Sequence, residues 1–349
     1  MDQRFDFVRR QTSRIVLGRE VTARLPELLR ELGARSPVLV HDEVLTPVAE
    51  RLAAAIGARL CIALPGGEQV KSLAQVGALA SRLRASGADR GTTLVAFGGG
   101  TIVDLVGFVA SVWLRGVPFV ALPTTTLALC DAALGGKNGV DHDGRKNELG
   151  TIRQPELIAG DVAWLRSLPD DVFAEGFVEA AKMAAVLDAE RFAALERLAP
   201  RLRARDDDAT LVAIGHAAAM KMAVVVADET EQDRRRWLNF GHTIGHALES
   251  LAAGALRHGP CVAIGMLAEC RAAADHVPTA VHDRLRTLLQ ALGAPVEFPR
   301  AYADAAQLWQ LAQHDKKARD GVVPMIVPTA IGTGAVVPLD AARLAKALA

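Results

Sequence analysis

The first half of the chain alternates short apolar segments with helical patterns, and this alternation restricts the fold more than any other feature. The apolar segments are rich in Val, Ile, Leu and Ala, as strands are when both faces of their sheet are covered. They span residues 37–42, 59–65, 92–100, 118–126 and 156–161. Helical stretches at 43–57, 72–87 and 101–114 lie between them. The pattern predicts a mainly parallel sheet with helices on both sides.

The second half changes character, because nearly every segment from about residue 165 to 314 has a helical pattern. The clearest helical stretches are 172–188, 209–227, 237–253 and 260–276. A short apolar segment at 321–328 can form one further strand. A helix start at 167–170 places the boundary near 161–170. We therefore expect an α/β domain over residues 1–165 and a helical domain over residues 166–349.

Composition excludes several classes of partner. The chain has 349 residues, half of them hydrophobic, and a formal net charge of zero. A neutral chain without a basic stripe argues against nucleic acid as the partner. The N-terminus has no apolar core of signal-peptide length, and no uninterrupted apolar run is long enough to span a membrane. The four cysteines are scattered without a CxxC pair, as in proteins of a reducing cytosol. We expect a cytoplasmic protein with a small-molecule partner.

The most distinctive stretch for function runs from Arg235 to His246. On one continuous helix, Arg235, Asn239, His242 and His246 stand at i, i+4, i+7 and i+11, which places all four on one face. His258 follows at the start of the next helical stretch. A guanidinium, an amide and imidazoles make poor core material, but they suit a metal and a polar anion.

Glu179 and Lys182 stand at i and i+3 on an otherwise apolar helical stretch. One interpretation is a salt bridge on the helix surface. The other joins the carboxylate to His242 and His258 in a metal site that keeps positions open for a ligand. The histidine pattern favours the metal site.

A glycine run at 98–100 follows an apolar strand and precedes a helix. Such a turn lets backbone N–H groups approach a pyrophosphate. The dinucleotide fingerprint is imperfect because Val103 stands where a third glycine is expected, so a tight strand–helix turn is the alternative. Asp104 can face a cofactor there. Asp42 ends the first strand, where a carboxylate often binds a ribose hydroxyl.

Further polar groups follow the other strands. Glu68 and Lys71 can contribute to a nucleotide site or form an exposed surface pair. The hydroxyls of residues 124–126 can bond a nucleotide or cap the next helix. Residues 131–141 and 145–147 combine glycines, cations and an amide, which suits a phosphate, with a solvated basic loop as the alternative.

Together these motifs resemble the 3-dehydroquinate synthase family, over about residues 37–330. The similar motifs are GGExxK at 66–71, GGGTIVD at 98–104, WLRG at 113–116, PTTT at 123–126, DAALGGKNGVD at 131–141, RKNELG at 145–150, EAAK at 179–182, LNFGHTIGHALE at 238–249, HG at 258–259 and DKK at 315–317. The resemblance implies a Rossmann-like α/β N-terminal domain and an all-α metal-binding C-terminal domain.

The resemblance also assigns site residues. It implies that zinc is held by Glu179, His242 and His258. It implies NAD contacts at Asp42, Glu68, Lys71, Gly99, Gly100, Asp104, Thr124 and Thr125. It implies catalytic roles for Lys137, Lys182, Arg235, Asn239 and His246. It implies substrate contacts at Arg115, Asp131, Lys146, Asn147 and Lys221, and at one of Lys316 and Lys317, which one sequence does not distinguish.

The reaction implied is that of 3-dehydroquinate synthase, in the shikimate pathway to the aromatic amino acids. It converts 3-deoxy-D-arabino-heptulosonate 7-phosphate to 3-dehydroquinate and phosphate. NAD is transiently reduced, phosphate is eliminated, the hydride returns, and an intramolecular aldol step closes the ring. We therefore expect a carbon–oxygen lyase that uses NAD and Zn²⁺, or Co²⁺, as a homodimer.

Several positions depart from the family's usual pattern and leave other functions open. They are Asn138, Glu148, Arg153, Asp171-Val172 and Pro260. A paralogous cyclase of the 2-deoxy-scyllo-inosose, amino-dehydroquinate or sedoheptulose 7-phosphate type is one alternative. The retained His246 favours 3-dehydroquinate synthase over the sedoheptulose-phosphate cyclases. A metal-dependent polyol dehydrogenase of the related fold, or an inactive homologue with a binding role, is a further alternative.

Overall fold

The computed structural model describes residues 11–313 and 322–348. They form two compact units, of which unit 1 comprises Met1–Pro123 and Gly135–Asp161. Unit 2 comprises Thr124–Leu134 and Val162–Ala349. The chain therefore enters unit 2 briefly after residue 123 before it returns, an excursion that the expected domain limits did not include.

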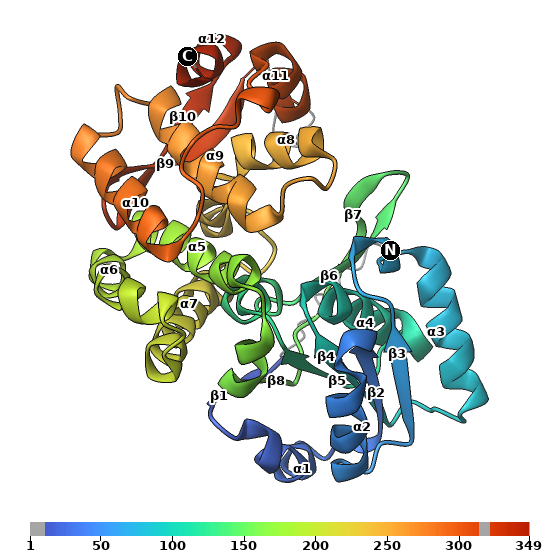
Figure 1. The fold of residues 1–349 in the computed structure, drawn as a ribbon. Coiled ribbons are helices and arrows are strands. Elements are labelled where there is room, and N and C mark those ends of the chain that lie inside the picture. The colour runs from blue at the N-terminus through green and yellow to red at the C-terminus, as the bar shows by residue number, and fades with distance from the viewer. Residues whose placement is uncertain (1–10, 314–321, 349) are drawn as a thin grey trace, which may run out of the picture. The chain divides into compact units, whose positions relative to one another are not determined.

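Unit 1 is built on a sheet of six parallel strands in the order β1-β8-β5-β4-β2-β3 (Figure 1). The strands are β1 (Arg14–Gly18), β2 (Arg35–Asp42), β3 (Leu60–Leu64), β4 (Thr92–Gly98), β5 (Phe119–Pro123) and β8 (Leu157–Asp161). All seven residues of β4 are buried, as expected for a central strand covered on both faces. The five strands and the parallel arrangement that the sequence predicts are confirmed; β1, a short edge strand, was missed.

Helices connect these strands. They are α1 (Val21–Glu31), η1 (Glu43–Leu45), α2 (Thr46–Ala55), η2 (Glu68–Val70), α3 (Leu73–Ala85), α4 (Gly100–Val112) and η3 (Trp113–Arg115). α3 begins where the Ser72 hydroxyl accepts a hydrogen bond from the Gln75 amide, a usual N-cap. α4 begins directly after β4 and buries most of its length, including Ile102 and Val106.

A β-hairpin that the sequence analysis took for a loop completes unit 1. Its antiparallel strands are β6 (Lys137–His142) and β7 (Arg145–Ile152). The turn between them is Asp143-Gly144, and both residues have positive φ, 47° and 74°. Asp-Gly is typical of a two-residue hairpin turn that needs left-handed backbone at both positions. The hairpin lies against α4, because a Cβ on Gly107 would meet the Asn138 side chain.

Unit 2 is mainly helical, which confirms the expected fold class. Its segments are η4 (Ala128–Ala132), η5 (Val162–Ser167), α5 (Asp170–Leu187), α6 (Ala189–Arg203), α7 (Asp207–Ala227), η6 (Arg234–Asn239), α8 (His242–Ala252), α9 (His258–Ala272), α10 (Thr279–Leu292), η7 (Arg300–Tyr302), α11 (Ala305–Gln313) and α12 (Ala341–Leu348). One antiparallel pair, β9 (Val323–Ala330) and β10 (Thr333–Leu339), interrupts them. The expected strand at 321–328 thus exists as β9.

Glycines allow α8 and α9 to pack closely. A Cβ on Gly265 of α9 would lie 2.1 Å from the Gly241 carbonyl oxygen, and a Cβ on Gly245 of α8 would lie 2.9 Å from that of Cys261. Neither position accepts a larger side chain without moving backbone. This close contact fixes the relation between the two helices that carry the histidines.

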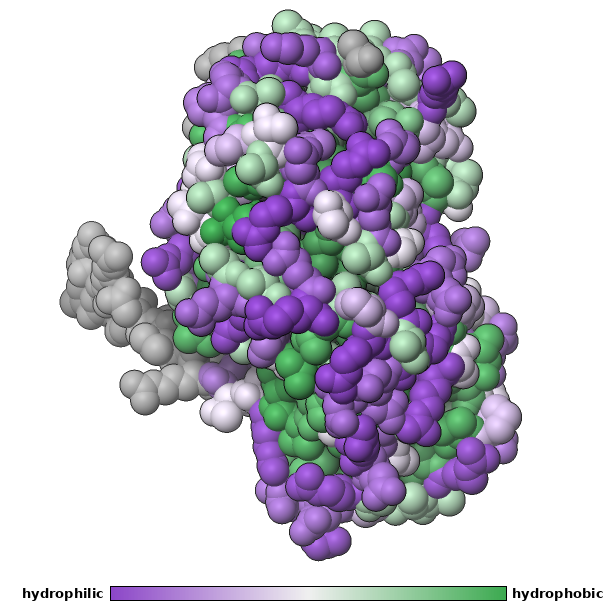
Figure 2. Space-filling view, turned by 60° about the vertical axis from the view of Figure 1, so that its left-hand side comes forward, coloured by the Kyte–Doolittle hydropathy of each residue, from purple (hydrophilic) through white to green (hydrophobic). Residues whose placement is uncertain are grey.

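One described helix, α7, is long and apolar enough to cross a membrane by length and composition. The apolar residues of α7 are interrupted by His216 and Lys221, so the expectation that the chain has no uninterrupted apolar run of that length is not contradicted. α7 buries Ala213 and Ala217 in the core of unit 2, and its Lys221 pairs with Asp131. The core helix of a globular protein passes the same test. On the face drawn in Figure 2, hydrophilic residues predominate and hydrophobic residues lie among them in smaller patches.

Candidate active site

The helix expected across residues 237–253 is broken, so the predicted four-residue face was wrong. η6 ends at Asn239, Gly241 has a φ of 78°, and α8 begins at His242. The break is required because Gly241 packs against α9, where a Cβ would lie 2.4 Å from Met266 Cγ. Only His242 and His246 share a helix face, and their ring centroids are 4.7 Å apart.

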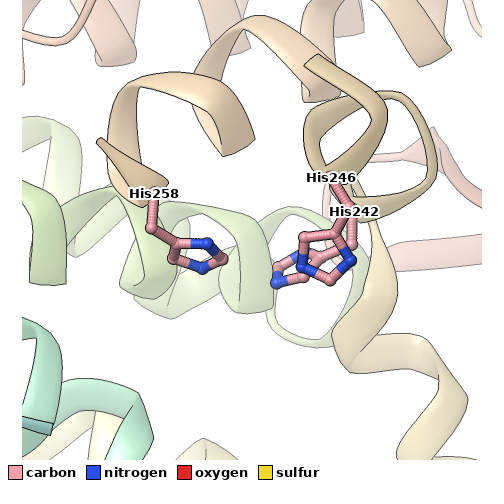
Figure 3. A group of neighbouring side chains, drawn as sticks. All are labelled: His242, His246 and His258. Carbon is pink, nitrogen blue, oxygen red and sulfur yellow. The ribbon is translucent and has the colours of Figure 1, made fainter. Parts of the chain in front are cut away.

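Three histidines converge within unit 2. His242 and His246 come from α8 and His258 is the first residue of α9, and Figure 3 shows the three rings pointing toward one another. Their candidate ligand atoms all lie within 4.8 Å of one another. Glu179 of α5 joins them: its Oε1 is 3.5 Å from Nε2 of His258 and 3.9 Å from Nε2 of His242. Tetrahedral ligands about 2.1 Å from one zinc ion are about 3.4 Å apart, so the spacing of Glu179 and His258 fits a shared ion.

Hydrogen bonds orient two of these rings. Nδ1 of His242 lies 3.2 Å from the carbonyl oxygen of Phe240. Nδ1 of His258 lies 3.0 Å from Oε2 of Glu249. With the proton on Nδ1 donated to these acceptors, the Nε2 lone pair of each ring faces Glu179. Such outer partners are typical of metal-binding histidines. Glu249 was missed in the sequence, although it is seven residues after His242, on the same helix face.

The Glu179 carboxylate is fully buried, and neither oxygen has a hydrogen-bond partner of normal geometry among the described residues. The Lys182 ammonium, also buried, lies against its Oε2. The salt bridge of the alternative interpretation therefore exists, but it is buried and does not lie on the helix surface. Burial alone would raise the pKa of Glu179, but Lys182 and His258 outweigh it and lower this pKa to about 2. A buried anionic oxygen without a regular donor suits a metal ion.

The pKa of His258 shifts in the opposite direction to that of Glu179. Burial would lower its pKa, but the Glu179 and Glu249 carboxylates raise it to about 10. Burial and the Lys182 charge hold the pKa of His242 well below its usual range. In the metal-free protein His258 therefore carries a proton between two carboxylates. A metal ion at the same place would replace that proton.

A second ion pair, between the buried Lys221 and the half-buried Asp131, lies in unit 2. The Lys221 ammonium of α7 donates to Oδ1 of Asp131 at 2.7 Å and to the Asp131 carbonyl oxygen at 2.6 Å. Burial would raise the pKa of Asp131, but the charges of Lys221 and Lys182 lower it. The excursion of residues 124–134 thus contributes Asp131 to the unit that holds the histidines.

Arg235 and Asn239 lie in η6 instead of α8. The Arg235 side chain is buried and donates from Nη1 to the Glu229 carbonyl oxygen at 2.6 Å. The Asn239 amide donates to Oε1 of Glu231 at 3.0 Å. Both partners come from the loop between α7 and η6.

The carboxyl edge of the unit 1 sheet gathers the expected nucleotide residues. β4, β2 and β3 are neighbours, and a Cβ on Gly66, just after β3, would lie 3.1 Å from Oδ2 of Asp42. Lys71 is buried, and its Nζ lies 2.9 Å from Oδ2 of Asp104 and 3.4 Å from Oε1 of Glu68. The alternative of an exposed pair is therefore wrong for Lys71. Burial would lower the pKa of Lys71, but Asp104 and Glu68 raise it.

Gly99 caps α4, and Gly100 is its first residue. Backbone N–H groups at such a terminus suit a phosphate. Of the threonines, Thr125 accepts from the Ala128 amide at 3.1 Å, which is the capping alternative. Thr124 is buried, and both belong to unit 2 by their contacts.

The hairpin of unit 1 carries Lys137, Lys146 and Asn147, all exposed. Asn147 has a φ of 53°, and its Oδ1 accepts from Nζ of Lys71 at 2.5 Å. One expected substrate residue thus contacts an expected nucleotide residue. Arg115 is exposed at the end of η3 and has a φ of 70°. Lys316 and Lys317 lie outside the described residues.

Two of the departures from the family pattern hold the base of this hairpin. The Asn138 amide donates to the carbonyl oxygens of Gly136 at 2.8 Å and Arg153 at 3.0 Å. The Arg153 guanidinium donates to the Val117 carbonyl oxygen at 2.8 Å and to Glu156 at 3.1 Å. Both side chains therefore bond to the scaffold of unit 1.

Two further departures, Pro260 and Asp171, have simple local settings. Pro260 lies in the first turn of α9, where a missing N–H costs nothing. Asp171 lies 3.5 Å from Nη1 of Arg257, the residue that precedes α9.

Glu269, which was not recognised from the sequence, is fully buried and accepts from the amides of Gly241 at 2.7 Å and Ile244 at 3.0 Å. It thereby caps the N-terminus of α8.

Comparison with known proteins agrees with this geometry. Residues 61–175 match the N-terminal part of 3-dehydroquinate synthase, and residues 176–318 match the C-terminal part. The 3-dehydroquinate synthase of Geobacter metallireducens (strain ATCC 53774 / DSM 7210 / GS-15) is 41% identical over 297 residues, 84% of this chain and 82% of that protein.

Two solved structures of cyclases share the fold over nearly the whole chain. The 2-epi-5-epi-valiolone synthase from Streptomyces hygroscopicus subsp. jinggangensis 5008, with NAD⁺ and Zn²⁺ bound, has a TM-score of 0.90 and 27% identity, covering 99% of this chain and 98% of that one. A 2-deoxy-scyllo-inosose synthase, with carbaglucose-6-phosphate, NAD⁺ and Co²⁺, has a TM-score of 0.87 and 25% identity, covering 96% and 95%.

The family, the fold class and the enzyme class expected from the motifs are thereby confirmed. Both parts of the family match in order, and the curated relative covers most of both chains. This chain belongs to the 3-dehydroquinate synthase family, whose members are phosphate-eliminating cyclases and thus carbon–oxygen lyases.

Proposed function

We propose that this enzyme converts 3-deoxy-D-arabino-heptulosonate 7-phosphate to 3-dehydroquinate and phosphate, with NAD and one divalent metal ion. The observation that carries the proposal is the cluster of charged and imidazole side chains in unit 2. It combines a carboxylate and imidazoles at ligand spacing with the buried cations Lys182, Lys221 and Arg235. A substrate with a carboxylate, a phosphate and hydroxyls needs this combination.

Glu179, His242 and His258 would hold the metal ion, as zinc or as cobalt. The Glu179 Oε1 atom, which faces both rings, and the two oriented Nε2 atoms fit that ion. When bound, the metal supplies Lewis-acid polarisation of substrate oxygens. The Lys182 ammonium lies against Oε2 of Glu179 and balances the negative charge of the carboxylate.

Asp42, Glu68, Lys71, Gly99, Gly100, Asp104, Thr124 and Thr125 would hold NAD. The N-terminus of α4 suits the pyrophosphate, and Asp42 at the end of β2 suits a ribose hydroxyl. When bound, NAD supplies reversible hydride transfer and is not consumed. The ion pair of Lys71 with Asp104 fixes the acidic group at this edge.

The remaining cations and amides would bind the substrate. Lys221 is held by Asp131, and Arg235 and Asn239 are held by their loop, so all three present fixed donors to an anion or a hydroxyl. The exposed residues Arg115, Lys137, Lys146 and Asn147 would bind the phosphate and hydroxyl groups, together with Lys316 or Lys317. Fixed donors reduce the entropy lost when the substrate binds.

His246 is our candidate for moving a proton near the metal. Its ring stands 4.7 Å from that of His242 and 5.8 Å from that of His258, centroid to centroid. Unlike the other two, it is exposed. An exposed imidazole can exchange a proton with water and with a bound substrate hydroxyl. Lys137 would assist by binding that hydroxyl.

We further propose a cytoplasmic homodimer that binds neither membranes nor nucleic acid. The four cysteines are all free, as in proteins of a reducing compartment. The neutral balance of charges gives no electrostatic attraction for nucleic acid. Light scattering of the purified protein tests the dimer.

The experiment that tests the function is phosphate release with a sub-stoichiometric amount of NAD. Metal-loaded protein receives 3-deoxy-D-arabino-heptulosonate 7-phosphate, sedoheptulose 7-phosphate and glucose 6-phosphate in separate reactions. Release from the first alone, with no net NADH, is expected. Release from one of the other two would assign a paralogous cyclase, and net NADH would assign a polyol dehydrogenase.

A further inference from the structure

The loop that joins α7 to η6 is organised by one carboxylate. Oδ1 of Asp228 accepts a hydrogen bond from the amide of Gln232 at 2.9 Å, and Oδ2 accepts from the amides of Asp233 at 2.7 Å and Arg235 at 2.9 Å. These backbone donors lower the pKa of Asp228 to about 2. The side chain is therefore an anion near neutral pH, and it holds the backbone amides of Gln232, Asp233 and Arg235 in place.

The same loop holds two side chains of the candidate site. The Glu229 carbonyl oxygen accepts from Nη1 of Arg235 at 2.6 Å. The Glu231 carboxylate accepts from the amide of Asn239 at 3.0 Å. Glu231 itself has a φ of 61°, a conformation that a non-glycine residue adopts only when its surroundings impose it.

Asp228 can therefore act on Arg235 and Asn239 through the backbone of the loop. It bonds the backbone of Arg235 directly and fixes the turn that presents Glu229 and Glu231. Arg235 is almost fully buried, so its donors have few alternative directions. A shift of the loop would move the acceptor oxygens of Glu229 and Glu231. The donors that bond to them, in Arg235 and Asn239, would then change direction.

We propose that Asp228 is a positioning residue for substrate binding, which sets the direction of Arg235 and Asn239 toward an anionic group of the substrate. This inference rests on the proposed function, in which Arg235 and Asn239 are substrate contacts. Asp228 is not placed among the metal ligands. Its loss should weaken binding of the anion and leave the metal site filled.

The test replaces Asp228 by Asn, which keeps the size of the side chain but turns one acceptor into a donor. Asp206→Asn is the matched control, because Asp206 also accepts a backbone amide, from Ala209 at 2.9 Å, at the start of α7. Both variants turn one acceptor oxygen near an end of α7 into a donor, but only the first lies at the loop. Asp228→Glu, which keeps the charge and both acceptor oxygens but displaces them by one methylene group, is the milder variant should Asp228→Asn fold poorly.

We expect Asp228→Asn to raise KM for 3-deoxy-D-arabino-heptulosonate 7-phosphate about ten-fold or more, with a smaller change in kcat and a full complement of metal. Asp228→Glu should show an intermediate KM, and Asp206→Asn should lower thermal stability alone. An unchanged KM in both Asp228 variants, or an equal rise in Asp206→Asn, would overturn the inference.

Calorimetric binding of inorganic phosphate separates this inference from the proposed function. Wild-type protein that binds phosphate but does not turn over the sugar phosphate would refute the function. Weaker phosphate binding in Asp228→Asn than in Asp206→Asn would then still support the role of Asp228. Equal phosphate binding in all three proteins, together with an unchanged KM, would refute it.

Discussion

Gly241 separates η6 from α8, and its replacement by alanine tests how the metal-binding histidines are placed. Its φ of 78° is unfavourable for any residue with a Cβ. A Cβ there would also lie 2.4 Å from Met266 Cγ and 2.9 Å from the Val262 carbonyl oxygen, both in α9. Because His242 is the next residue, relief of this clash must move the first turn of α8.

Two separate costs set the expected loss of unfolding free energy in Gly241→Ala. The left-handed conformation costs an alanine about 1–2 kcal/mol. Overpacking against α9 adds about 1–3 kcal/mol, so Gly241→Ala should lower the free energy of unfolding by roughly 2–5 kcal/mol. A displaced His242 should also weaken metal binding about ten-fold or more.

Gly254 provides a matched control. It follows α8 with a φ of 89°, and nothing lies within 4 Å of a Cβ at that position. Gly254→Ala therefore has the conformational cost, about 1–2 kcal/mol, without the clash. Denaturant unfolding of the metal-free variants and competition with a chelator for zinc measure both quantities. Equal unfolding free energies and wild-type zinc affinity in both variants would refute the placement of His242 by the break at Gly241.

Three further predictions concern other parts of the account. Asn138→Ala removes one buried and one part-buried hydrogen bond at the hairpin base and should cost about 2–4 kcal/mol of unfolding free energy. A negligible change in denaturant unfolding would contradict it. The raised pKa of His258, about 10, means that its proton is bound near neutral pH and must leave when metal binds. Calorimetry in buffers of different ionisation enthalpy should therefore detect release of about one proton, with apparent affinity rising with pH until it passes that pKa; zero release would contradict this. His246→Ala should keep its metal and lose about 100-fold in kcat, and unchanged turnover would exclude a proton-transfer role.

Most of unit 1 could be predicted from the sequence because buried parallel strands leave a simple signature. β2, β3, β4, β5 and β8 each contain a short apolar run with buried residues. β1 was missed because it lies at the sheet edge and none of its residues is fully buried. The hairpin was missed because its exposed residues lack an apolar run, although Asp143-Gly144 is a recognisable turn.

The histidines could be found by their spacing, but their supporting groups could not. Helical periodicity correctly places His242 and His246 on one face because both lie in α8. The same periodicity gave a wrong prediction for Arg235 and Asn239, because the break at Gly241 depends on tertiary packing with α9. Helix propensity and periodicity carry no information on such a contact.

Contacts between residues that are far apart in the sequence could not be predicted for the same reason, because they depend on tertiary packing. Lys221 meets Asp131 across 90 positions of sequence, and Lys71 meets Asn147 across 76. No local pattern marks either pair. The resemblance to a family named these residues, and the folded chain shows which of them touch.

X-ray absorption spectroscopy of zinc-loaded protein tests the central claim, that Glu179, His242 and His258 form one metal site in unit 2. The account predicts one zinc per chain with nitrogen and oxygen ligands, two of them imidazoles, and no sulfur, at about 2.0–2.2 Å. It predicts that Glu179→Gln and His258→Ala each lose this signature. Wild-type metal content and an unchanged spectrum in both variants would contradict the account.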